Sequence, residues 1–376
     1  MRIGINMIAL YDTKSSGAFR YIKLLMQQLG RYDLSDCEFV VYKQQLIPKE
    51  YIGIPETLKV EYVDVPNVGH GISRIIFEQT LFYRYLKPCD VFYSYCTSMP
   101  LFVRAKRIFT LHDVYYLTCK ERYGTLQTAY LKFITKLYCR RSTAILTVSE
   151  FSKSEICRHL DVSPEKISIT TNFLLPEPPA AGVDPETVRI TDIDGREADM
   201  KKPFFLYVGN LQPAKNIDGM TAGFGQFSLA HPEYNLIIVG KPTNKGDEII
   251  SHLRRQAASN VYYIGYQSRE VVEYLFGACV ATVLLSFCEG FGIPPLEGFR
   301  YGKPALVSNA ASLPEVVGPA GVLADPYNTE DIAAGFEQII ARRESLAAAT
   351  AGQLKKFSPE HSVQVFMNVL GIKTND

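Results

Sequence analysis

Short apolar runs of strand length alternate with segments of helical period along this chain, and the alternation occurs as two separate series. The first series starts with an apolar run at 3–10 and a helical segment at 19–29, and the second starts at 204–209. Such alternation is typical of parallel sheets whose strands are connected by helices. Since 376 residues exceed the usual size of one domain, we expect two α/β domains.

A stretch of different character separates the two series. It begins with a proline-rich run at 175–179 and continues as a polar segment up to residue 202, which favours a linker. Near the C-terminus, Ser358 followed by Pro359 is a typical helix start. We therefore expect an N-terminal domain over 1–178, a linker or surface excursion over 179–202, and a C-terminal domain over 203–356. A C-terminal helix follows over 357–376. This helix can pack on either domain, and a return to the N-terminal domain is one of the two arrangements.

Composition excludes several classes of protein. The formal net charge of +1 gives no reason to expect a nucleic-acid partner. The eight cysteines form no CxxC pair and no zinc-like spacing with histidine, which favours a reduced, cytoplasmic protein. No apolar stretch reaches the roughly 18 to 20 residues of a membrane span, so we expect any membrane contact to be peripheral.

The most informative string covers residues 287–304 and follows an apolar strand. Glu289, Gly290 and Gly292 precede a short helix that carries Glu297, which we place on its first turn. Glycines let backbone amides approach a ligand, and free N–H groups at a helix start attract phosphate or hydroxyl oxygens. Both carboxylates are then positioned to accept hydrogen bonds from sugar hydroxyls. A strand-to-helix turn with a capping Glu and no ligand is the alternative.

This string resembles the Glu-x7-Glu signature of the family 4 (group 1) glycosyltransferases, which include many bacterial mannosyl- and glucosyltransferases of cell-surface polysaccharides. The resemblance covers nearly the whole chain. It implies the GT-B fold, an α/β architecture in which two Rossmann-like domains face each other across a cleft. The N-terminal domain is then expected to bind the acceptor and the C-terminal domain the nucleotide-sugar donor. It also implies that Glu289 contacts hydroxyls of the donor sugar and that Glu297 binds the ribose of the nucleotide. The neighbouring donor-binding residues that it implies are Gly290, Phe291, Gly292 and Ile293.

A second match lies at 207–216, which resembles the family's loop with a basic pair that neutralises the donor diphosphate. Lys215 fits one member of the pair, and Gly209 and Asn210 are expected to line the donor site beside it. The arginine is absent, because Asn210 and Ala214 occupy the two places where relatives tend to carry one. A fixed cation at a leaving group usually lowers the barrier substantially. A solvated surface lysine is the alternative for Lys215.

Two further residues match the family more weakly, and two more are expected at the site from their positions after strands. The resemblance implies that Gly17 lies against the donor phosphates and that His112, followed by Asp113, contacts the transferring sugar. A structural role at a strand end is the alternative for His112. We also expect Lys241 near the base or phosphates and Tyr266 beside the base, with a buried aromatic as the alternative for Tyr266.

The resemblance implies a retaining, metal-independent transfer of a hexose to a glycan or lipid-linked acceptor in polysaccharide synthesis. We expect this hexose to be mannose. The predicted catalytic residues are Glu289, Lys215 and His112. The donor is GDP-mannose or a UDP-hexose, and no cofactor is expected. No Asp-x-Asp metal motif occurs. The missing arginine motivates one alternative, a catalytically weak or silent sugar-nucleotide binding protein, and a GT-B epimerase or phosphorylase is another.

Residues 128–141 mix apolar and basic side chains at helical spacing. Such a helix can lie on an anionic membrane, which suits a lipid-linked acceptor at the inner face of the cytoplasmic membrane. A core-packed helix with a solvated basic edge is the alternative.

Overall fold

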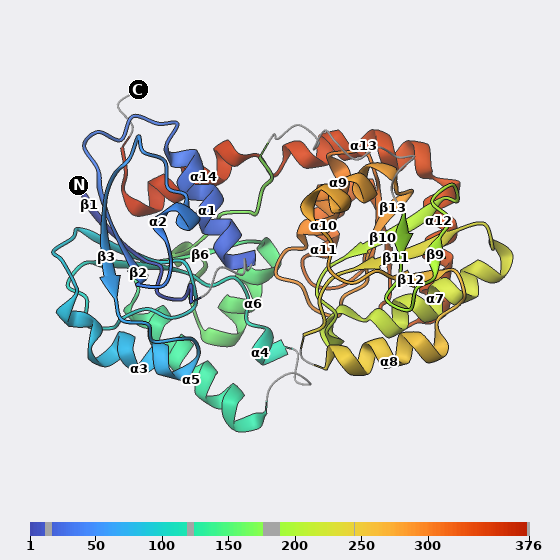
Figure 1. Ribbon diagram of the computed structural model, residues 1–376. Coiled ribbons are helices and arrows are strands. Elements are labelled where there is room, and N and C mark those ends of the chain that lie inside the picture. Colours follow the sequence, from blue (N-terminus) through green and yellow to red (C-terminus); the bar gives the residue numbers. More distant parts are fainter. Residues whose placement is uncertain (12–16, 119–123, 176–188, 244, 374–376) are drawn as a thin grey trace. The chain divides into compact units, whose positions relative to one another are not determined.

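The computed structural model describes residues 1–11, 17–118, 124–175, 189–243 and 245–373 (Figure 1). The chain forms two compact units, which we call unit 1 and unit 2. Unit 1 consists of residues 1–175 together with 358–376, and unit 2 of residues 176–357.

Unit 1 is built on a seven-stranded parallel sheet with the order β3-β2-β1-β4-β5-β6-β7. The strand order reverses between β1 and β4, and the carboxyl edge at such a reversal is where ligands bind in open α/β sheets. Its elements are β1 (Arg2–Asn6), α1 (Gly17–Leu29), β2 (Glu38–Gln44), α2 (Lys49–Ile52), β3 (Lys59–Val65), α3 (Ile72–Thr80), η1 (Phe82–Arg84), β4 (Val91–Ser94), β5 (Lys106–Thr110), α4 (Tyr115–Thr118), α5 (Thr125–Arg141), β6 (Ala144–Thr147), α6 (Glu150–Leu160), η3 (Pro164–Lys166), β7 (Ile167–Ile169) and α14 (Pro359–Leu370).

Helix α14 completes unit 1 although it comes last in the chain. Ser358 caps it by accepting a hydrogen bond from His361 N, and Pro359 is its first residue, so the predicted helix start is confirmed. The helix packs against α1, which lies beside it in Figure 1, and against β7. The Phe366 ring meets the ring of Tyr93 in β4 edge to face, with centroids 5.0 Å apart. Residues 358–370 therefore belong to the core of unit 1.

Unit 2 contains a six-stranded parallel sheet with the order β12-β11-β10-β13-β14-β15, which reverses between β10 and β13. Its elements are β8 (Ile190–Thr191), β9 (Glu197–Ala198), β10 (Phe204–Val208), η4 (Pro213–Lys215), α7 (Ile217–Ala230), β11 (Asn235–Val239), α8 (Gly246–Gln256), β12 (Val261–Tyr263), α9 (Arg269–Ala278), β13 (Ala281–Leu284), α10 (Ile293–Phe299), β14 (Ala305–Ser308), α11 (Leu313–Val317), η5 (Gly318–Ala320), β15 (Gly321–Ala324), α12 (Thr329–Ala341) and α13 (Arg343–Lys355).

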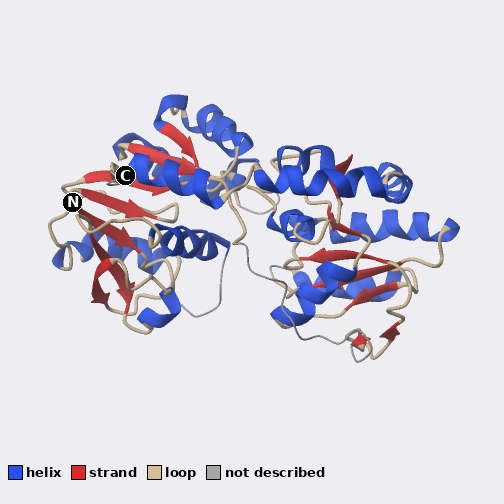
Figure 2. Ribbon diagram, turned by 90° about the horizontal axis from the view of Figure 1, so that it is seen from above, coloured by secondary structure: helices blue, strands red, loops and turns tan. Residues whose placement is uncertain are grey.

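Both sheets carry helices on their two faces (Figure 2). Central strands such as β4 and β11 are buried along their whole length, as expected for parallel strands covered on both sides. The predicted α/β fold with two Rossmann-like sheets is confirmed.

The segment predicted as a linker differs from that expectation in its second half. Strands β8 and β9 pair as a small antiparallel hairpin, and Ile190 and Ala198 are buried in the core of unit 2. Inside the turn, Arg196 Nε donates to Asp192 Oδ2 at 2.7 Å. The sequence signal was weak because isolated apolar residues in a polar stretch show no period.

Candidate active site

Lys215 and Glu289 meet at the carboxyl edge of the unit 2 sheet, where the strand order reverses. Lys215 ends the short helix η4 after β10, and its Nζ donates a hydrogen bond to Glu289 Oε1 in the loop after β13. Ser286 Oγ donates to the same carboxylate oxygen at 2.8 Å. The backbone joins the two loops as well, because Phe287 N donates to Ala214 O at 2.9 Å. The two side chains are only 18% and 11% exposed.

The backbone around Glu289 is fixed by one hydroxyl and one glycine. Ser312 Oγ lies 2.7 Å from Glu289 O and 3.0 Å from Phe291 O. Gly292 adopts φ +95°, and a Cβ there would lie 2.4 Å from Leu313 Cδ2. A side chain at this position would therefore displace the loop that presents Glu289.

The described structure provides a single basic side chain, Lys215, in contact with Glu289. Asn210 is exposed, and its carbonyl accepts a hydrogen bond from Tyr207 Oη at 3.0 Å. Burial, and to a lesser extent the charge of Glu289, raises the pKa of Tyr207 well above its usual value. The tyrosine therefore stays neutral beside the carboxylate. No arginine takes the second cationic place in this loop.

Gly209 lies in van der Waals contact with the next loop of unit 2. Gly240 has φ +153°, and a Cβ built on it would fall 1.8 Å from Gly209 O. Leu211 N donates to Lys241 O at 2.8 Å, which fixes the two loops further. This close approach places the backbone of the predicted donor-binding residues at one edge of the sheet.

Lys241 and Tyr266 contact each other on the surface of unit 2. Lys241 Nζ lies 3.9 Å from the centroid of the Tyr266 ring, a cation–π geometry. Tyr266 is 68% exposed, so the alternative of a buried aromatic is wrong. An exposed ring with a lysine on one face leaves its other face free to stack on a planar ligand.

Glu297 lies in α10, which starts at Ile293. The expectation of a first-turn position is wrong, because the helix begins immediately after Gly292 and leaves Glu297 as its fifth residue. The Glu297 side chain is half-buried.

The other predicted residues of this string lie in the loop before α10. Gly290 belongs to the same loop as Glu289. The ring of Phe291 packs edge to face on the ring of Phe357, with centroids 5.3 Å apart.

In unit 1, His112 follows β5 at the carboxyl edge of the sheet. Its Nε2 lies 3.1 Å from Tyr95 O, and its ring meets the ring of Tyr21 edge to face at 5.1 Å. Burial lowers the pKa of His112 to about 4. The imidazole is therefore neutral at pH 7, with Nε2–H donating to the carbonyl and Nδ1 remaining an acceptor. Gly17 opens α1, and a Cβ there would meet nothing within 4 Å.

The sequence did not predict a set of buried hydroxyl groups near His112, which contacts one of them through the ring of Tyr21. Tyr21 Oη is hydrogen-bonded to Thr170 Oγ1, and Tyr93 Oη lies 2.6 Å from Thr110 Oγ1. Burial raises the pKa of Tyr21 to about 12, so it remains protonated. Tyrosines in apolar runs carry no distinguishing sequence signal.

Among the described residues, no group of three or more His, Cys, Asp or Glu side chains could hold a metal ion. In the same part of the chain, every helix is too short or too polar to cross a bilayer.

Two doubly wound units in one chain, with a lysine–carboxylate pair at the carboxyl edge of the second, are what the resemblance to the GT-B glycosyltransferases predicts. Two family profiles match: Glycosyltransferase Family 4 over residues 15–174 and Glycosyl transferases group 1 over residues 188–354. O-antigen chain mannosyltransferase B of Escherichia coli is 30% identical over 272 residues, covering 70% of this chain and 69% of that protein.

Two further comparisons agree with the family match. The serotype-specific mannosyltransferase WbdA of Escherichia coli is 26% identical over 70% of this chain, which spans only 33% of that longer protein. Anabaena HepE, solved in complex with UDP and glucose, shares the fold with a TM-score of 0.71 at 16% identity, over 99% of each chain. The chain belongs to the family 4 (group 1) glycosyltransferases and is a glycosyltransferase with the GT-B fold.

Proposed function

We propose that this enzyme transfers mannose, with retention and without a metal ion, from a nucleoside diphosphate donor to a glycan acceptor in cell-surface polysaccharide synthesis. The Lys215–Glu289 pair at the carboxyl edge of the unit 2 sheet carries the proposal. GDP-mannose is the preferred candidate for the donor, because two relatives are O-antigen or serotype-specific mannosyltransferases. A UDP-hexose is the second candidate for the donor, because the structurally similar HepE was solved with UDP.

In this proposal Lys215 stabilises the negative charge that develops on the departing diphosphate. Glu289 neutralises Lys215 before the donor arrives and then accepts a hydrogen bond from a hydroxyl of the donor sugar. The bond from the anomeric carbon to the diphosphate breaks as the acceptor oxygen bonds to the same face. The acceptor proton goes to the departing phosphate oxygen, so no side chain acts as nucleophile. Neutral His112 contributes Nδ1 as an acceptor for a sugar hydroxyl.

The donor is identified by incubating the purified chain with GDP- and UDP-sugars, with and without EDTA, while thermal stability and nucleoside diphosphate release are followed together. One donor should raise the melting temperature and be consumed equally in EDTA. Glu289→Ala and Lys215→Ala should remove release, and Lys355→Ala on the exposed surface of α13 should not. A donor that raises the melting temperature without release of nucleoside diphosphate would instead support the alternative that the absent arginine suggests, a sugar-nucleotide binding protein.

We further propose that α5 contacts an anionic membrane surface, where a lipid-linked acceptor would be found. The N-terminal half of α5 leaves Leu126, Tyr130 and Phe133 on one face, 88%, 48% and 70% exposed. The helix carries four basic residues and no acidic one, and its burial is confined to the C-terminal half. An apolar face beside basic side chains favours binding to anionic lipid.

Sedimentation with phosphatidylcholine vesicles, with and without phosphatidylglycerol, tests this contact. The wild-type chain should sediment only with the anionic vesicles, and Leu126→Ser with Phe133→Ser should reduce that fraction severalfold. Leu229→Ser is the matched control, because Leu229 is 86% exposed on α7 of unit 2. Equal sedimentation of both variants would contradict a role for α5.

A further inference from the structure

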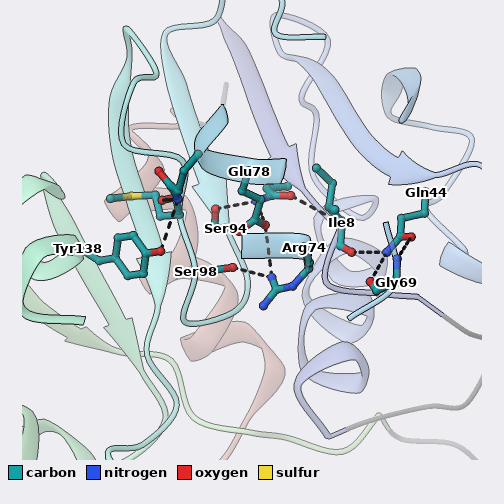
Figure 3. Close-up of polar contacts among 11 residues, drawn as sticks. Ile8, Gln44, Gly69, Arg74, Glu78, Ser94, Ser98 and Tyr138 are labelled. Atoms are coloured by element: carbon teal, nitrogen blue, oxygen red, sulfur yellow. Dashed lines mark hydrogen bonds and ion pairs between the residues drawn. The ribbon is translucent and has the colours of Figure 1, made fainter. Parts of the chain in front are cut away.

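Unit 1 has a polar cluster at the point where its strand order reverses, in the position that Lys215 and Glu289 occupy in unit 2. Asn6 ends β1, Ser94 ends β4, and Glu78 lies in α3. Figure 3 shows Glu78 and Ser94 in this cluster. Asn6 Nδ2 donates to Glu78 Oε1 at 3.1 Å and lies 3.3 Å from Ser94 Oγ. The carboxyl edge at this reversal is the ligand-binding place of an open α/β sheet.

Glu78 is a buried carboxylate that the proposed chemistry does not use. Its side chain is 0% exposed, and its Oε2 has no hydrogen-bond partner in the part of the chain that the structure describes. Removing a charge from water is costly unless the charge is paired. The paired charge here is Arg74, whose Nη1 lies 3.3 Å from Glu78 Oε1.

The guanidinium of Arg74 is fixed by hydrogen bonds at Nη1, whereas its Nε and Nη2 are accessible to solvent. Its Nη1 also donates to Ser98 Oγ at 2.5 Å (Figure 3). A guanidinium has five N–H donors, and Nε and Nη2 have no partner among the described residues. Neither atom is buried, and the side chain is 15% exposed. Two nitrogens of a fixed, planar group therefore face solvent at the edge of the sheet.

The same loop connects this group to the predicted catalytic histidine. Residues 95–98 follow β4, and Tyr95 O accepts the hydrogen bond from His112 while Ser98 accepts the one from Arg74. A ligand on Arg74 would thus lie along the same edge as His112. The two open N–H donors of Arg74 lie in one plane, so they match adjacent hydroxyl oxygens of a polyhydroxylated ligand.

We propose that Arg74 binds hydroxyls of the acceptor sugar and that Glu78 is its positioning residue. Nε and Nη2 of Arg74 donate to adjacent hydroxyl oxygens, while Glu78, Asn6 and Ser98 fix the plane of the guanidinium. This inference rests on the proposed transfer function, since it names the residues of unit 1 that bind the acceptor of that reaction.

The kinetic test uses the full chain with a donor and a mannose-containing oligosaccharide as acceptor. Arg74→Gln should raise the acceptor KM about tenfold or more and leave the donor KM unchanged, because the lost contact is made to the acceptor alone. Glu78→Gln keeps the side-chain shape and should raise the same KM, whereas a general folding defect would also lower donor hydrolysis by water. Arg84→Gln is the matched control, since the Arg84 side chain is hydrogen-bonded to the exposed neighbour Tyr83 and stacks over its ring.

A binding test keeps this inference separate from the proposed transfer. Saturation-transfer NMR with the same oligosaccharide, without donor, should give a signal in wild type and in Lys215→Ala that Arg74→Gln removes. Retention of that signal in folded Arg74→Gln would overturn the inference even if transfer is observed. Binding of inorganic phosphate that depends on Arg74, with no oligosaccharide signal, would overturn it too, because the site would then recognise an anion.

Discussion

Lys215 and Glu289 form an ion pair inside unit 2 although 74 positions separate them in sequence. Ser286 donates to the same carboxylate oxygen, and the hydrogen bond from Phe287 N to Ala214 O joins the loops that carry the two side chains. The pair is preorganised before any donor is present. A group whose charge is already fixed requires little reorganisation when a diphosphate departs.

Lys215→Met and Glu289→Gln should each lower kcat/KM by about a hundredfold or more. Because the two side chains act as one unit, the double variant should be little worse than the poorer single variant. Steady-state kinetics on the four proteins of this cycle measure the coupling. Losses that multiply in the double variant would show that the two residues act independently.

Gly240→Ala should destabilise unit 2 by about 3 kcal/mol or more, because the new methyl group would overlap Gly209 O and the backbone φ is +153°. Gly225→Ala in α7 is the matched substitution, since a Cβ there meets nothing within 4 Å. It should stabilise the protein by about 0.5–1 kcal/mol. Urea unfolding of both variants distinguishes the two outcomes, and similar effects would contradict the close contact of the two loops.

His112 should make the protein less stable in mild acid. Its folded pKa is about 4, below the ordinary value of 6.5, so between these pH values the unfolded state binds more protons. Stability should therefore fall as pH decreases from 6.5 to 4, by about 1–2 kcal/mol after allowance for partial solvent access. Unfolding free energies of wild type and His112→Asn across this range test the effect. An unchanged pH slope in the variant would assign the acid sensitivity to other groups.

Tyr21→Phe should cost about 1–2 kcal/mol of folding free energy, because Thr170 would lose its buried hydroxyl partner. Tyr327→Phe is a suitable comparison, as Tyr327 is 79% exposed. Thermal unfolding reports the difference. A Tyr21→Phe variant as stable as wild type would show that water replaces the missing hydroxyl.

The fold was largely predictable because its signals are local. The apolar runs predicted both sheets, and helix α5 (Thr125–Arg141) contains the segment 128–141 whose spacing indicated a helix. Ser149 caps α6 by accepting from Ser152 N at 3.0 Å, and such a cap is a local feature of the sequence. The hairpin at 190–198 was not predicted, because its stability comes from burial of two residues against a distant core.

The candidate site was predictable only in part. Glu289 and Lys215 were found from their loops, yet their direct contact depends on which strands become neighbours, and sequence spacing does not contain that information. Arg74 and Glu78 were missed for a different reason. An Arg four residues before a Glu on a helix is usually a solvent-exposed pair, and only the sheet packed beneath α3 makes this pair buried.

The return of α14 to unit 1 has a consequence for biosynthesis. Unit 2 is complete in sequence at residue 357, whereas unit 1 lacks α14 until residues 358–370 have been translated. As domains tend to fold during synthesis as their residues emerge, the second unit of the chain can reach its native state before the first. Until then the apolar surface of α1 that α14 covers stays open to chaperones and proteases. A chain that ended at residue 357 would carry all of unit 2 beside a unit 1 that lacks α14.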